Sequence, residues 1–229
     1  MKKILCLLLT LSCSITLWGQ SNKHFEGSIF FSFDVTGGGE ELELSRAFLP
    51  HGYKLQVKGE KVRMRMEGGM VAAMFGDIVF DGSTNLQFML NDANKTVTMM
   101  PAEKAQEAKI PEGIKVERGS NDKEIAGYQT QHYLVKNDNK PGELMEFWVT
   151  EALNFRAPKG NNSSPLGAGY GYGIKGFPLQ LVMEQAGMTI TMEAKSVKQE
   201  KLADQIFEIP NDYKKSEFNP AMFNFGGDE

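Results

Sequence analysis

Apolar and polar residues alternate with a period of two along most of this chain, which is the pattern of β-strands that bury one face. The segment Lys61–Glu67 shows it most cleanly, because Val62, Met64 and Met66 alternate with charged side chains. Turns rich in glycine and asparagine separate these segments and join several of them as hairpins. The pattern predicts strands over residues 25–35, 53–58, 61–67, 77–80, 85–90, 95–100, 143–149, 177–184 and 188–197, and one within Lys123–Lys136 that follows a glycine turn at Ala126-Gly127.

Helices are predicted in two short segments, Met70–Phe75 and Ala102–Lys109. An apolar sheet face has to be covered, and two short helices are too few to cover so many strands. We therefore predict a mainly β fold in which one antiparallel sheet of about ten strands curves strongly into a half-barrel, with a few short helices. The basic side of Lys61–Glu67 is interpreted as a solvated outer surface.

The first residues have the pattern of a secretory signal peptide, with two lysines, an apolar run over Ile4–Leu17 and a small residue at the exit. We place the cleavage after Gly19, which removes residues 1–19. Lipidation of Cys13 is an alternative that the preceding residues fit less well. Both cysteines lie in this signal, so the mature chain would have no disulfide and no cysteine metal site. An exported protein without disulfides is typical of the periplasm of a Gram-negative-type bacterium, where it is free or associated with the outer membrane.

The rest of the chain is expected to form a single domain, residues 20–218, followed by a frayed tail, residues 219–229. A segment rich in glycine and tyrosine, residues 158–176, is interpreted as one long loop of that domain and is called the Gly/Tyr segment below. The net charge of −4 gives no basic surface, so no nucleic-acid partner is predicted. No later apolar run approaches the length of a membrane span, so no transmembrane segment is predicted in the mature chain.

Four blocks of residues carry a resemblance to a known family. They are Glu124–Tyr128 with His132–Lys136, then Glu146–Thr150, Gly176–Leu179 and Phe207–Tyr213. Together they resemble a family of exported bacterial proteins of unknown function, and their order is similar to that of the outer-membrane lipoprotein carriers. The resemblance implies a strongly curved antiparallel half-barrel with helices on its concave side. It implies no catalytic residue, and the short helices and the Gly/Tyr segment depart from the carriers, so lipoprotein transport does not follow.

The residue types that usually carry enzymatic or metal chemistry form no pattern here. The histidines, His24, His51 and His132, are far apart and lack the spacing of zinc ligands, and His132 is expected on the outward side of its strand. The residues Gly171–Gly176 spell Gly-x-Gly-x-x-Gly, but a strand follows where a dinucleotide site needs a helix. We therefore predict no enzymatic activity, no catalytic residue, no metal and no cofactor.

Methionine is the unusual residue, with 13 in the chain and many of them on predicted strands. The spacing Met64-x-Met66 can bind copper, but no histidine stands beside it. Two other interpretations stay open, namely ordinary core filling and a flexible lining for an apolar ligand, since unbranched methionine adapts to varied shapes. The predicted lining consists of Phe31, Phe33, Leu55, Met64, Met66, Phe88, Phe147, Leu181, Met183, Ile190 and Met192.

The Gly/Tyr segment also has two interpretations, a plain surface insertion or a mobile lid with Tyr170 and Tyr172 at the mouth of a cavity. The sequence thus predicts a non-catalytic periplasmic protein that binds an apolar small molecule, a lipid or acyl chain, in the concave face of a half-barrel. The alternative is an envelope protein-interaction or sensing module with a filled core, in which Lys61–Glu67 and the Gly/Tyr segment contact the protein partner. An enzyme without a recognisable motif is the third class.

Overall fold

The computed structural model describes residues 24–39, 46, 48–100, 110, 112–140, 142–155, 172–185 and 187–218. Four predicted segments lie wholly or mostly outside these residues: the signal peptide, the helix over 102–109, the Gly/Tyr segment before Tyr172, and the tail over 219–229. Cys13 and Tyr170 lie outside them as well.

The described residues form one large sheet with a single short α-helix, α2 (Gly69–Phe75), and one 3₁₀ turn, η1 (Asp204–Phe207). All strand pairs are antiparallel except β13 with β6. The strands are β1 (Glu26–Gly37), β2 (Gly52–Lys58), β3 (Lys61–Glu67), β4 (Asp77–Asp81), β5 (Leu86–Asn91), β6 (Thr96–Met100), β7 (Ile114–Arg118), β8 (Lys123–Ile125), β9 (Tyr128–Asn137), β10 (Leu144–Thr150), β11 (Phe177–Gln185), β12 (Met188–Gln199) and β13 (Lys214–Ser216).

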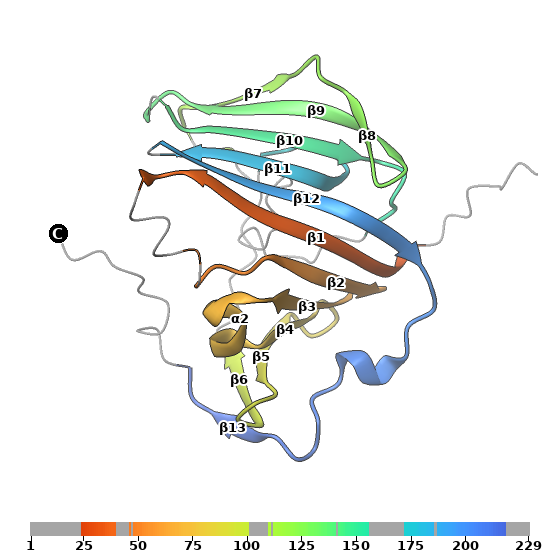
Figure 1. Cartoon of the computed structure of the whole chain (residues 1–229). Coiled ribbons are helices and arrows are strands. Elements are labelled where there is room, and N and C mark those ends of the chain that lie inside the picture. Colours follow the sequence, from red (N-terminus) through yellow and green to blue (C-terminus); the bar gives the residue numbers. More distant parts are fainter. Residues whose placement is uncertain are drawn as a thin grey trace, which may run out of the picture.

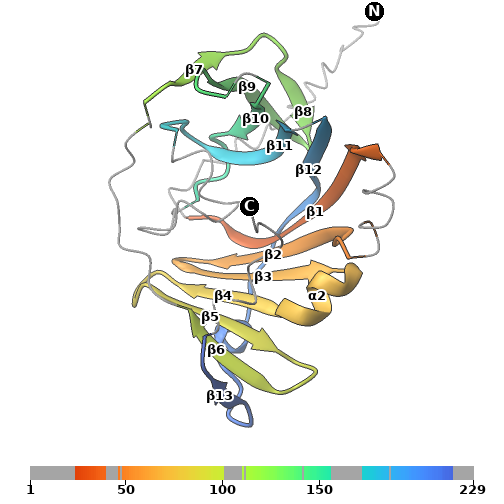
Figure 2. The same cartoon turned by 90° about the vertical axis from the view of Figure 1, so that its left-hand side faces the viewer.

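The strands follow the order β13-β6-β5-β4-β3-β2-β1-β12-β11-β10-β9-β7, with β8 paired to the start of β9 (Figure 1). Their direction turns gradually along this order, as expected for the twist of a large sheet (Figure 2). The prediction of a mainly β, mostly antiparallel sheet is confirmed. The sheet has thirteen strands rather than about ten, and its strong curvature into a half-barrel stays a prediction.

The two faces of the sheet differ in character. Residues directly opposite each other on neighbouring antiparallel strands point to the same face. The register pairs Met64 with Leu55 and Leu55 with Ile29, and on the other half Met192 with Leu181 and Leu181 with Phe147. We call the face that carries Met64, Met66, Met145, Met183 and Met192 the methionine face, and the other one the opposite face.

The opposite face is covered at the β3–β6 end by residues 200–218, which we call the C-terminal arm. Leu202 and Phe207 of this arm pack against Val79, Leu90 and Val97 in a buried apolar cluster. The arm ends in β13, which adds to the edge of β6. This cover explains why β5 carries the apolar residues Phe88 and Leu90 on the opposite face as well as Met89 on the methionine face.

Candidate functional site

The methionine face carries all but one of the predicted lining residues. Four of them, Phe31, Leu55, Phe147 and Leu181, are buried in the core beneath it. The others remain half-buried and are therefore the ones that a ligand could contact: Phe33, Met64, Met66, Met183, Ile190 and Met192. Met145, which pairs directly with Met183 and is also half-buried, belongs to the same surface although the prediction omitted it.

Phe88 is the exception, and its predicted place on the lining is wrong. It pairs with Val79 across β4 and β5, whereas the methionine face of those strands carries Ile78 and Met89. Phe88 therefore points to the opposite face, where it packs at the edge of the cluster beneath the C-terminal arm.

The methionine face is free of charge over six neighbouring strands. On β3, β2, β1, β12, β11 and β10, every described strand residue that points to this face is uncharged. The half-buried side chains span five strand spacings from Met64 to Met145, which is about 24 Å at the usual separation of neighbouring strands. This surface can bind apolar groups, and its described residues offer no group for acid–base chemistry.

Tyr172, at the end of the Gly/Tyr segment, packs onto the methionine face. Its ring centroid lies 6.1 Å from that of Phe147, and its hydroxyl donates to the Met145 Sδ at 3.9 Å. Burial, followed by the negative charge of Glu143, raises the pKa of the Tyr172 hydroxyl. Ile174, two residues later, is fully buried in the same cluster. The predicted lid residue Tyr172 thus contacts the predicted lining.

A polar cluster lies on the opposite face, over β9 and β10, and includes two of the family blocks. His132 was expected to face outward, and it does point away from the methionine face, but only 5% of it is exposed. Its ring stacks on that of Trp148 with centroids 4.5 Å apart, and its Nε2 lies 2.7 Å from a carboxylate oxygen of Glu146. His132 is thus on the outward side of its strand as expected, but the segment after β7 covers it there.

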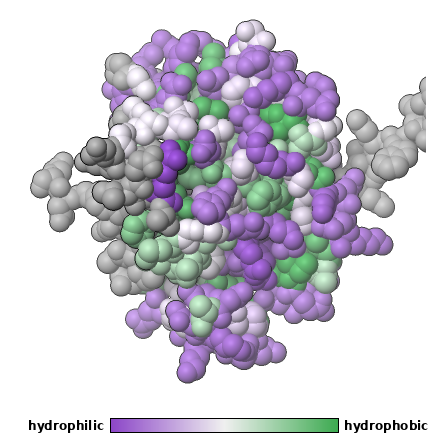
Figure 3. Space-filling view, viewed as in Figure 1, coloured by the Kyte–Doolittle hydropathy of each residue, from purple (hydrophilic) through white to green (hydrophobic). Residues whose placement is uncertain are grey.

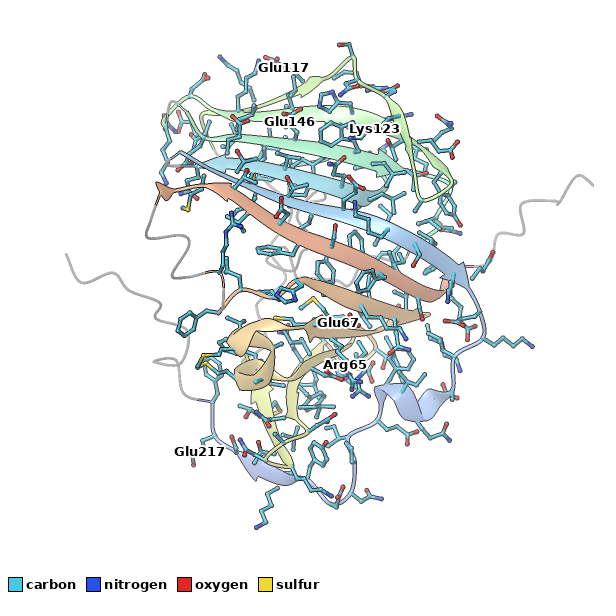
Figure 4. The ribbon with its side chains drawn as sticks, viewed as in Figure 1. Arg65, Glu67, Glu117, Lys123, Glu146 and Glu217 are labelled. Atoms are coloured by element: carbon cyan, nitrogen blue, oxygen red, sulfur yellow. The ribbon has the colours of Figure 1, made fainter. Side chains whose placement is uncertain are left out.

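That segment, Gly119–Asp122, is held by both aromatic rings. The Asn121 backbone N–H donates to His132 Nδ1 at 3.3 Å, and the Asn121 carbonyl accepts from Trp148 Nε1 at 2.7 Å. The Lys123 ammonium lies 4.1 Å from the centre of the Trp148 ring, a cation–π contact (Figure 4). Gly119 has to be glycine, because a Cβ there would lie 2.0 Å from His132 Nδ1.

Asp122 fastens the same segment to β7 and β9. Its carboxylate accepts from the guanidinium of Arg118 and from the backbone N–H of His132. These two interactions, the first being larger, lower the pKa of Asp122 to about 2. Every polar group of His132 is hydrogen-bonded to a neighbour, so the cluster holds the segment Gly119–Asp122 in place.

The basic side of β3 is not the free solvated surface that the sequence predicted. Asp77, which is 5% exposed at the start of β4, accepts hydrogen bonds from Arg63 and from Arg65. Arg63 also donates to the backbone carbonyl of Ile206 at 2.8 Å. Arg65, which is labelled in Figure 4, pairs with Asp92. The two arginines are therefore neutralised, and Arg63 ties the C-terminal arm to the sheet.

Within the described part of the chain, no three His, Cys, Asp or Glu side chains are grouped so that they could hold a metal ion. Its helices are all too short to cross a membrane.

Comparisons with solved structures find distant similarities. A structure described as PNGF-II aligns with 86% of this chain and 32% of its own, at 18% identity and a TM-score of 0.49. The complex of MucA and MucB from Pseudomonas aeruginosa aligns with 82% of this chain and 57% of that chain, at 11% identity and a TM-score of 0.46. A crystal structure of MucB aligns over 83% and 58%, at 10% identity and a TM-score of 0.36. This chain thus spans less than two thirds of each of those chains.

No curated protein matches the sequence. A family model described as "Domain of unknown function (DUF4412)" matches residues 38–213, which contain all four of the blocks recognised in the sequence. The expected membership of a family of unknown function is confirmed, and the chain belongs to the DUF4412 family.

Proposed function

We propose that this protein binds an apolar ligand, a lipid or acyl chain, on the methionine face and catalyses no reaction. The observation that supports the proposal is a face that is uncharged over six neighbouring strands, five of which carry half-buried methionine, phenylalanine or isoleucine side chains. A linear chain laid across it gains about 0.8 kcal/mol for each methylene removed from water, before the cost of ordering the ligand. Flexible thioether side chains suit ligands of varied length.

Methyl NMR of protein labelled at the methionine methyl groups tests this directly. Added fatty acid or phospholipid is expected to shift the signals of Met145, Met183 and Met192, and to leave those of the exposed Met70 and Met74 in place. Trp148 fluorescence is a poor reporter, because that ring lies on the opposite face. A matched pair of variants completes the test: Met192→Glu places a charge on the methionine face, and Thr191→Glu places one beside it on the opposite face.

We expect Met192→Glu to lose the lipid adduct seen by native mass spectrometry of protein purified from its own envelope, and Thr191→Glu to keep it. The proposal fails if the envelope-purified protein has no lipid-sized adduct and added lipids shift no methionine signal. It also fails if both variants bind equally well while remaining folded.

We also propose that the chain is exported and acts in the periplasm or at the outer membrane. The N-terminal pattern supports export, and the mass of the mature protein distinguishes the two routes. Cleavage after Gly19 gives a chain that starts at Gln20, whereas lipoprotein processing gives a lipidated Cys13. An unprocessed N-terminus in protein purified from the envelope would contradict both.

A protein-interaction role is the second candidate, favoured by an exposed apolar patch around α2. Phe48, Met70 and Met74 are among the most exposed large apolar residues of the described chain, and α2 carries no charged side chain. The patch shows as pale green over α2 (Figure 3). Large exposed apolar patches mark contact sites. Crosslinking in the envelope tests this role with the double variant Met70→Ser, Met74→Ser. The second candidate replaces the first if a protein partner is crosslinked to the unaltered protein and not to the double variant, and if added lipids shift no signal of the methionine face.

A further inference from the structure

The buried histidine of the polar cluster has a defined protonation pattern. Nδ1 of His132 faces the Asn121 backbone N–H, which can only donate, so Nδ1 must be the unprotonated acceptor. Nε2 must then carry the proton and donate it to the Glu146 carboxylate. Neutral His132 is therefore satisfied at both ring nitrogens.

A second proton on His132 has a clear structural consequence. It must bind to Nδ1, where the Asn121 N–H already points, and two donors would then face each other. The contact to Glu146 is unchanged, because Nε2 is protonated in both forms. The change thus falls entirely on the segment Gly119–Asp122.

Four charged side chains lie around the stacked rings of His132 and Trp148. Glu146 on β10 and Asp122 beside β7 are negative, whereas Arg118 and Lys123 are positive. The Glu146 side chain is 24% exposed, so solvent reaches the partner of the buried ring. Histidine is the side chain whose unperturbed titration falls between about pH 5 and 8.

We propose that the contact between His132 and Asn121 is a pH-sensitive latch on the opposite face. Protonation of His132 breaks the hydrogen bond between the Asn121 amide and Nδ1, while the bonds of Gly119 and Asp122 to the His132 backbone hold the rest of the segment. Turning the peptide bond between Ser120 and Asn121 presents the Ser120 carbonyl to the new Nδ1–H and restores a hydrogen bond. The Asn121 carbonyl stays with Trp148, so the rearrangement is local.

Two NMR measurements on the same protein test the latch. Nitrogen-15 spectra of labelled histidine report the tautomer and the protonation of His132, and hydrogen exchange reports the protection of the Asn121 amide. We expect the Nε2–H tautomer at pH 8. As the ring gains its second proton, the protection of Asn121, corrected for the intrinsic exchange rate, should fall by about tenfold or more, while protection in β10 stays constant.

His132→Gln removes the titrating group, and His24→Gln removes an exposed histidine as the matched control. The fall in protection should vanish in the first variant and persist in the second. Three results would overturn the latch: a ring that protonates without loss of Asn121 protection, an equal loss in His132→Gln, or a ring that stays neutral until the protein unfolds. If His132→Gln does not fold, the two measurements on the unaltered protein still decide the matter.

Discussion

Replacing Asp77 with asparagine is expected to weaken both the sheet and the attachment of the C-terminal arm. Asp77 is almost fully buried and accepts from Arg63 Nε at 2.6 Å and from Arg65 Nε at 2.9 Å. Removing one member of a buried ion pair costs about 3–5 kcal/mol, because the remaining charge is left buried. Arg65 is 49% exposed and regains water, so we expect the loss to lie near the lower end, about 3 kcal/mol.

Asp92→Asn is the matched control, because Asp92 pairs with the same Arg65 but lies at the surface. A surface pair contributes about 0–1 kcal/mol. Urea unfolding followed by circular dichroism measures both variants, and hydrogen exchange at Phe207 measures the arm, since Arg63 also donates to the Ile206 carbonyl. We expect faster exchange at Phe207 in Asp77→Asn alone. Equal stability losses in the two variants would show that the buried network contributes no more than a surface pair.

Three smaller predictions concern single positions of the upper sheet. Ala126 has a positive φ of 49°, so Ala126→Gly should raise the free energy of unfolding by about 0.5–1 kcal/mol. A variant less stable than the unaltered protein would mean that the packing of the Ala126 methyl group outweighs the backbone strain. The buried Oε1 of Gln180 has no hydrogen-bond donor among the described residues, so Gln180→Met should stabilise by about 1 kcal/mol; a loss would reveal a bound water or another donor. Because the pKa of Asp122 is lowered to about 2, its contribution to stability is complete above the unfolded pKa of about 3.9 and disappears as the pH falls towards 2. Unfolding at pH 2–7 should therefore show a stability gap between the unaltered protein and Asp122→Asn that is constant above about pH 5 and closes below pH 4; a gap that stays constant refutes the assignment.

The strands with one polar and one apolar side were predictable from sequence. The segment Lys61–Glu67 matches β3 at both ends, because its alternation is unbroken and turns flank it. The edge strands β7 and β13 escaped the prediction for a physical reason. Both are short, and charged side chains at Lys115, Glu117 and Lys214 leave them without a clear apolar side.

The sequence did not predict the surroundings of a side chain correctly where a distant segment covers the sheet. Alternation assigned Phe88 to the common apolar face, because a period of two cannot reveal that the C-terminal arm makes a second apolar surface on β5. The same limit applies to His132, which Gly119–Asp122 buries, and to Arg63, which Asp77 neutralises. The partners in each case are 10 or more residues away along the chain, and local sequence contains no signal for such cover.

The segments that cover the two faces of the sheet are held by different kinds of contact. This difference makes the methionine face the better candidate for binding. The opposite face is closed at one end by apolar contacts from the C-terminal arm and at the other by the segment Gly119–Asp122, and both covers are fixed by charged hydrogen bonds. On the methionine face, the described cover includes Tyr172 and Ile174, which hold to it by apolar packing and one weak bond to sulfur. A contact of that kind can be exchanged for a ligand's apolar surface at little cost, because no buried charge loses its partner. Ligand exchange at the methionine face is therefore physically easier than on the opposite face, where the same step would break ion pairs.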